Sequence, residues 1–130
     1  MPTAKSSFEI TSWEQNEIDR EGAFGLGHAV VKKTFSGEIE GTTVAQLLLG
    51  GVEGGGMAYS GFERFDVSVS GRRGGFVLLH YATMSAGDGS TSWEILPGSG
   101  TGELEGISGS GEIVRHDDGS HDFTLTYDLP

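Results

Sequence analysis

The stretch from Gly56 to Tyr81 contains two runs of alternating side chains, joined by the glycine-rich segment Ser70–Gly75. Because side chains of a β-strand point alternately to opposite faces, this alternation predicts two strands. Glycine tolerates the positive φ values of tight turns, so the segment between the two runs predicts a turn. The stretch therefore predicts an antiparallel β-hairpin and indicates a β-rich fold.

One titratable residue lies on the apolar face of each predicted strand: Glu63 on the first and His80 on the second. The neighbours on those faces are apolar or aromatic, with Tyr59, Phe65, Val67 and Val69 beside Glu63, and Phe76, Leu78, Ala82 and Met84 beside His80. Counted from the middle of the turn, the two residues lie within about one residue pair of each other, so we expect a contact across the strands. An acid and an imidazole directed at an apolar interior indicate a functional site.

The rest of the chain repeats this pattern of short alternating runs separated by glycines. The 23 glycines of the 130 residues show no collagen period, and 3 prolines are present. The further strands we expect are Ser7–Glu14, His28–Ser36, Glu38–Val52, Ser92–Leu96, Glu112–His116 and His121–Leu129. About eight strands in one domain, residues 1–130, predict an all-β fold, an eight-stranded antiparallel β-barrel whose closure removes exposed edges. A two-sheet sandwich is the alternative.

Four segments are expected to connect these strands. Gln15–Gly27 is polar and then glycine-rich, and predicts a loop, as does Ala86–Ser90. Asp117–Ser120 has the composition of a hairpin turn. The glycines of Gly98–Gly111 have neither the Lys-Ser/Thr pair of a phosphate loop nor dinucleotide-binding spacing, and predict a strongly bent strand at a barrel corner. In that segment, inward packing of Leu104 would leave Glu103 facing solvent.

Charge and composition exclude several kinds of partner. The formal net charge of -11 argues against binding of nucleic acid or of an anionic membrane, because both require clustered basic residues. The absence of cysteine excludes disulfides and thiolate chemistry. No apolar run approaches the ~20 residues of a membrane-spanning helix, and the N-terminus has no apolar core of a secretory signal. We therefore expect a cytoplasmic protein without a cofactor.

Glu63 and His80 are the candidate catalytic residues. Burial of Glu63 among apolar neighbours would raise the pKa of its carboxyl group toward the range useful for proton transfer. A Glu–His contact would orient the imidazole as a general base. The structural alternative is a carboxylate paired inside the barrel with His80 or with a backbone N–H group.

Aromatic side chains on the inward faces are candidate ligand contacts. They are Tyr59, Phe65, Phe76, Trp93 and Tyr127. The phenols of Tyr59 and Tyr127 would also donate hydrogen bonds to an oxygen of a ligand, although core packing is the common role of such residues. The sequence also groups His116, Asp117, Asp118 and His121 around one predicted turn, but Asp-Gly is ordinary turn chemistry and we expect no metal site there.

Several segments together resemble a known family of small bacterial proteins. They are Phe8 to Trp13, Phe35–Gly41, Tyr59–Arg64, Gly75–His80, Ser92-Trp93 and Gly98–Leu104. The family is catalogued only as a domain of unknown function and is placed with the barrels related to plant allene oxide cyclase. The resemblance covers about Phe8 to Leu129 and implies an eight-stranded antiparallel barrel, often an oligomer. No catalytic residue of the plant enzymes matches a residue of this chain.

The better-known relatives of that family guide ring closure or coupling of a reactive substrate inside an apolar cavity. The resemblance therefore implies a homo-oligomeric barrel that binds a small hydrophobic molecule, as a cofactor-independent isomerase or cyclase. Two alternatives remain open. The first is a barrel that binds such a molecule without turnover, and the second is a structural barrel whose lumen is filled by its own aromatic side chains.

Overall fold

The computed structural model describes residues 1–85 and 88–130, and these residues contain strands and turns only. Nine strands are formed: β1 (Thr3–Glu21), β2 (Phe24–Gly37), β3 (Ile39–Val52), β4 (Met57–Val69), β5 (Arg72–Ser85), β6 (Asp88–Ile95), β7 (Thr101–Gly102), β8 (Ser108–Arg115) and β9 (His121–Asp128). Within the described ranges we find no helix of the length and apolar character that a membrane-spanning helix needs.

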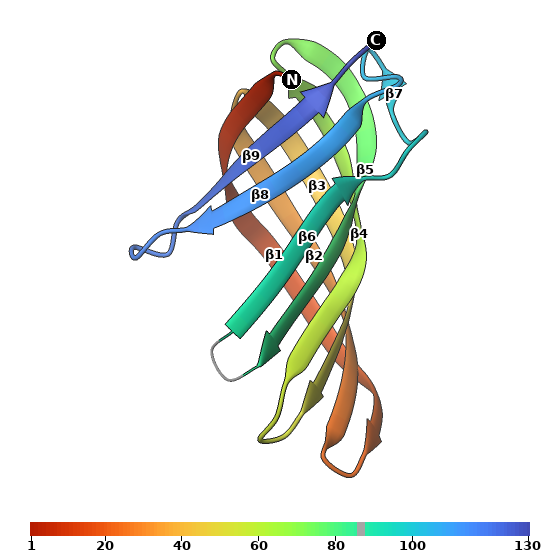
Figure 1. Cartoon of the computed structure of the whole chain (residues 1–130), viewed down its shortest axis with the longest axis vertical. Helices are drawn as coiled ribbons and strands as arrows, with labels where there is room; N and C mark the ends of the chain where they lie inside the picture. The colour runs from red at the N-terminus through yellow and green to blue at the C-terminus, as the bar shows by residue number, and fades with distance from the viewer. Residues whose placement is uncertain (86–87) are drawn as a thin grey trace.

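Eight of these strands close into one antiparallel barrel. The order around the sheet is β4-β3-β2-β1-β9-β8-β6-β5, and pairing of β4 with β5 joins its two ends. The short β7 adds to the end of β5 near the chain termini (Figure 1). The predicted eight-stranded antiparallel barrel is therefore confirmed, and the sandwich alternative is wrong because one sheet closes on itself.

The loop predicted for Gln15–Gly27 is wrong. Residues 15–21 continue β1, and Gly25 to Gly27 already pair with it as part of β2. The reversal needs only residues 22 and 23, with Gly22 at a φ of 59°. This hairpin projects from the end of the barrel opposite the chain termini (Figure 1), and both faces of β1 are exposed to solvent there. The segment therefore lacks the apolar alternation by which the other strands are predicted.

The turn of the predicted hairpin is also shorter than expected. Val69 pairs with Arg72, so Ser70 and Gly71 alone make the turn, with φ values of 48° and 87°. Positive φ at both central residues is the geometry that matches the twist of the flanking strands. The loop expected over Ala86–Ser90 is shorter as well, because residues 88–90 belong to β6, whereas residues 86–87 lie outside the described residues.

The segment Gly98–Gly111 is not one bent strand. Thr101 and Gly102 form β7, turns follow, and β8 begins at Ser108. The turns place Leu104 and Ile107 in the core, at 0% and 1% exposure. Leu104 packs inward and Glu103 is exposed, which is the arrangement considered for the sequence. The segment lies at the end of the barrel near the C-terminus (Figure 1).

The two halves of the barrel are packed differently. In the half near the termini four phenylalanines, Phe35, Phe65, Phe76 and Phe123, fill the lumen, with ring centroids of Phe65 and Phe76 4.5 Å apart. In the other half the equivalent inward positions of β2, β3 and β5 hold Ala29, Ala45 and Ala82. A smaller cluster packs there, formed by Ala29, Val31, Ala45 and Leu47 with Leu49 and Tyr59 against it. These side chains do not fill the same cross-section as the phenylalanines, so this half, the open end, remains partly hollow.

The barrel wall is also less continuous at the open end. β1 pairs with β9 only over Thr3–Phe8, and β6 pairs with β8 only at Trp93 and Glu94. Beyond these positions β1 and β6 continue toward the open end, whereas the β8–β9 hairpin turns away from β6 (Figure 1). The open half is therefore built mainly by β1 to β6.

Candidate functional site

A buried polar network lies at the boundary between the filled half and the hollow half. The Glu63 carboxylate on β4 is 1% exposed and accepts hydrogen bonds from three side chains. Lys33 Nζ on β2 and His80 Nε2 on β5 donate to Oε1 at 3.1 and 2.6 Å, and Thr43 Oγ1 on β3 donates to Oε2 at 2.5 Å. Four adjacent strands thus each contribute one member.

The alternation of each strand places these groups together. On β2 Lys33 lies between Val31 and Phe35 on the inward face, and Thr43 pairs with it across β3. Glu63 pairs with Leu78, and His80 lies one inward position further along β5. The Lys33 ammonium also lies over the Phe8 ring, 4.7 Å from its centroid, which is a favourable position for a cation.

The network determines the ionisation of Glu63. Burial by itself would raise the pKa of the carboxyl group, but the hydrogen bond from His80, the positive charge of Lys33 and the hydrogen bond from Thr43 outweigh it. The pKa is lowered from 4.5 to about 2. The raised pKa expected from the sequence is therefore wrong, because polar partners surround the carboxylate. At neutral pH Glu63 is a charged acceptor, and its carboxylate fixes the proton of His80 on Nε2.

Tyr59 and Trp93 lie next to this network, toward the open end. The indole of Trp93 meets the imidazole of His80 edge to face, with centroids 5.7 Å apart. Burial raises the pKa of the Tyr59 phenol, the nearby Trp93 N–H lowers it and the Glu63 charge raises it further. The Trp93 indole N–H is fully buried, yet it makes no hydrogen bond to any acceptor in the part of the chain that the structure describes.

The hollow half contains a cavity of about 1020 Å³ that opens at the end of the barrel. Its wall includes Leu26, Leu49, Ala82 and several glycines, and the Tyr59 side chain belongs to its inner surface. Arg20 and Arg115 are among the residues at its margin. The lining is therefore mainly apolar with a few polar groups, which is the usual composition of a small-molecule site.

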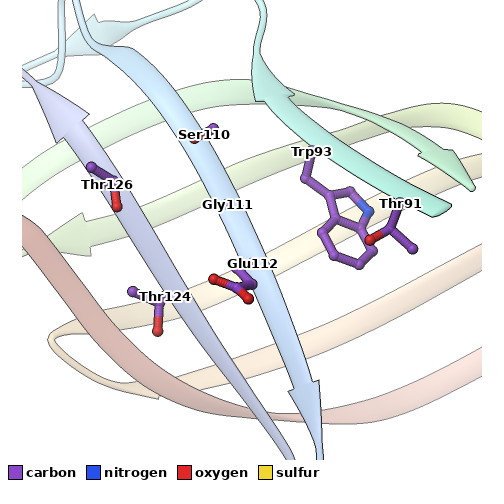
Figure 2. A pocket seen from close by; sticks show the side chains of 7 residues that line it. All are labelled: Thr91, Trp93, Ser110, Gly111, Glu112, Thr124 and Thr126. Atoms are coloured by element: carbon purple, nitrogen blue, oxygen red, sulfur yellow. The ribbon is translucent and has the colours of Figure 1, made fainter.

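A second, smaller pocket of about 300 Å³ lies where β6 and β8 separate. Figure 2 shows its lining of Thr91 and Trp93 from β6, Ser110 and Glu112 from β8, and Thr124 and Thr126 from β9. Hydroxyl groups and one carboxylate dominate this lining, so the small pocket differs in chemistry from the cavity at the open end. Trp93 lines the small pocket, whereas Tyr59 lines the large one.

The structure separates the residues predicted as ligand contacts. Tyr59 lines the large cavity and Trp93 the small pocket. Phe65, Phe76 and Tyr127 instead belong to the core of the filled half and line neither of these pockets. The sequence predicted ligand contacts for them because alternation shows that a side chain points into the barrel. Alternation does not show whether other side chains fill the lumen at that position.

The predicted contact between Glu63 and His80 is present, whereas two partners of Glu63 were missed. Lys33 and Thr43 both alternate with apolar residues on inward faces, and this is the signal that marks them. Near the predicted turn Asp117–Ser120, His116 pairs with Asp122 and Asp118 accepts hydrogen bonds from Ser120. Among the described residues no group of three or more His, Asp or Glu side chains has the arrangement of a metal site.

The fold and the buried network define a small all-β barrel with a polar layer beneath an open cavity. A family model described as "Protein of unknown function (DUF3224)" matches residues 4–127, and the chain belongs to this family. It is similar to a crystal structure of a DUF3224 protein of unknown function from Shewanella oneidensis MR-1, with 27% identity and a TM-score of 0.86. The match covers 100% of this chain and 98% of the other. No curated protein matches the sequence.

Proposed function

We propose that this protein binds a small, largely apolar molecule in the cavity at the open end of the barrel. The observation that carries the proposal is the change from a core with four phenylalanines in one half to a smaller cluster of alanine and aliphatic side chains in the other. This change leaves about 1020 Å³ of space lined mainly by apolar groups. A barrel stabilised only by its own side chains would continue the phenylalanine packing through both halves.

The buried network supports this proposal in a structural way. A layer made of Lys33, Thr43, Glu63 and His80 ends the apolar core and forms a polar support beneath the cavity. Because all three donors are directed at Glu63, they hold His80 and its neighbour Trp93 in fixed positions. The layer beneath the cavity is thus held rigid, and a rigid support reduces the entropic cost of binding.

Catalysis is the second candidate function. The resemblance to allene oxide cyclase barrels favours a cofactor-independent isomerase or cyclase, and the Glu63–His80 hydrogen bond is the arrangement that orients an imidazole for proton transfer. However, neither Glu63 nor His80 lines the cavity, whereas Tyr59 does. A catalytic version of the proposal therefore assigns contact with the substrate to the Tyr59 phenol and positioning roles to Glu63 and His80.

Filling the cavity is expected to abolish binding. In Leu49→Trp the larger side chain enters the cavity, whereas in Leu48→Trp it points outward from the adjacent position of β3. We expect the affinity for the fluorescent apolar probe Nile red to fall about tenfold or more in Leu49→Trp, because the probe and the indole compete for the same volume. Leu48→Trp is the matched control and should bind like the wild type.

The two variants are compared by fluorescence titration after their folding has been verified by circular dichroism. Equal Nile red affinities in the two variants and the wild type would show that the probe binds outside the cavity, and would contradict the proposal.

A further inference from the structure

The outer wall of the barrel carries an apolar patch on β3, β4 and β5. Three successive outward positions on each of these strands lie side by side in the register and form a block of nine. Six of the nine hold apolar or aromatic side chains, namely Val44, Leu48, Phe62, Val77, Leu79 and Tyr81. Phe62 and Tyr81 are each 51% exposed, and Leu79 is 38% exposed. We call this block the outer patch.

The outer patch contains no acidic side chain. Its three other positions hold Gln46, Ser60 and Arg64, although the chain has 19 Asp and Glu residues. The outward positions of β9 are different, because Asp122 and Asp128 lie there on either side of two threonines. Exposed aromatic side chains and an arginine, without acidic residues, are the composition found at the centre of protein–protein interfaces. The outer patch therefore indicates an interaction surface.

The charges beside the outer patch favour a second copy of this chain as the partner. Arg64 on β4 pairs with Val77, and Glu94 on β6 pairs with Leu79, so the two charges lie on opposite sides of β5. Neither forms an ion pair within residues 1–85 and 88–130. A two-fold dimer uses the same surface on both subunits. An axis near Leu79, between the two charges, therefore places Arg64 of each copy against Glu94 of the partner subunit.

Net charge and area agree with this partner. Two chains of net charge -11 repel each other, so a contact free of acidic residues is needed for close approach. Strands lie about 4.8 Å apart and rise about 3.4 Å per residue. The outer patch, the adjoining faces of β2 and β6 and one further outward position at each end thus cover roughly 700 Å². A stable interface buries about 800 Å² on each partner, so the size is that of a dimer contact.

From these observations we infer that the chain forms a two-fold homodimer through the outer patch. Phe62 and Leu79 lie at the centre of the interface, and two Arg64–Glu94 ion pairs between the subunits lie at its margin. The patch belongs to the outer wall, so the inference is independent of what the cavity binds.

Sedimentation equilibrium tests the surface. The wild type should have the mass of two chains of 13.7 kDa. Phe62→Glu should raise the dissociation constant of the dimer about a hundredfold or more, because it buries an unpaired carboxylate on each side of the interface. Val114→Glu is the matched control, since Val114 is an equally exposed apolar residue on β8, outside the outer patch. This control should remain dimeric, and circular dichroism verifies that both variants are folded.

Charge exchange tests the two-fold arrangement. Arg64→Glu and Glu94→Arg each bring like charges together across the interface, so each variant alone should be mainly monomeric. An equimolar mixture of the two should form heterodimers, because both ion pairs are restored between unlike chains.

Three results would overturn the inference. A wild type that is monomeric at about 100 μM would mean that a different molecule covers the outer patch. A dimer that persists in Phe62→Glu would be formed through another surface. Arg64→Glu and Glu94→Arg proteins that associate no better together than separately would exclude the pairing of Arg64 with Glu94.

Discussion

Exchange of Glu63 for glutamine is expected to lower the free energy of unfolding by about 3–5 kcal/mol, the usual cost of removing one partner from a buried ion pair. The side chains of Glu63 and Lys33 are 1% and 9% exposed, so water cannot replace the lost countercharge of Lys33. Glutamine preserves the size of the side chain, so the decrease in the free energy of unfolding results from the missing charge and not from altered packing. The measurement is urea denaturation at pH 7.

The double variant Lys33→Met/Glu63→Gln is the control for this first prediction. Because methionine removes the unpaired ammonium, the double variant should be more stable than Glu63→Gln alone. A loss below about 1 kcal/mol in the single variant would indicate a solvated pair, as on a protein surface, and would contradict the buried network.

The stability of the wild type is expected to decrease by about 3 kcal/mol through Glu63 as the pH falls from 4.5 to 2. The folded protein holds the pKa of this carboxyl at about 2, below its ordinary value of 4.5, so the folded state binds the proton less readily than the unfolded state. The contribution of Glu63 is fully present above pH 4.5 and is lost as the pH falls through 2. The pKa of Glu63 differs by 2.5 between the unfolded and folded states, and at 1.36 kcal/mol per pKa unit this gives the expected loss of about 3 kcal/mol.

The other 18 carboxylates of Asp and Glu also titrate in this range, so the comparison is made between the wild type and Glu63→Gln. The stability difference between the two proteins should be constant near neutral pH and should shrink between pH 4.5 and 2. A difference that stays constant down to pH 2 would mean that the pKa of Glu63 is the same in the folded and unfolded states.

Much of the fold could be predicted because the filled half of the barrel has strict alternation. Glu38–Val52 and His121–Leu129 alternate clearly, and their predicted bounds agree with β3 and β9 within one residue. β1 was predicted only to Glu14 because its second half lies at the cavity margin, where apolar side chains are not required on either face. Hydrogen bonding to β2 keeps this half extended, and that pairing has no local sequence signal.

The candidate site could be predicted in part for a similar reason. The Glu63–His80 contact follows from the register of one hairpin, which is a local property of the sequence. The contribution of Lys33 depends on β2 lying beside β3 in a closed barrel, and so it required the full topology. The pKa of Glu63 was predicted in the wrong direction because a sequence shows that a position is inward but not how many donors meet there.

The central claim is that the open half of the barrel holds a small apolar molecule. Native mass spectrometry of the protein purified from its own host, followed by denaturing release of any bound compound, tests this claim most directly. The account predicts one small, largely apolar molecule per chain in the wild type and in Leu48→Trp, and none in Leu49→Trp. A wild-type protein that shows only its bare mass, even after incubation with a broad metabolite extract, would contradict the account.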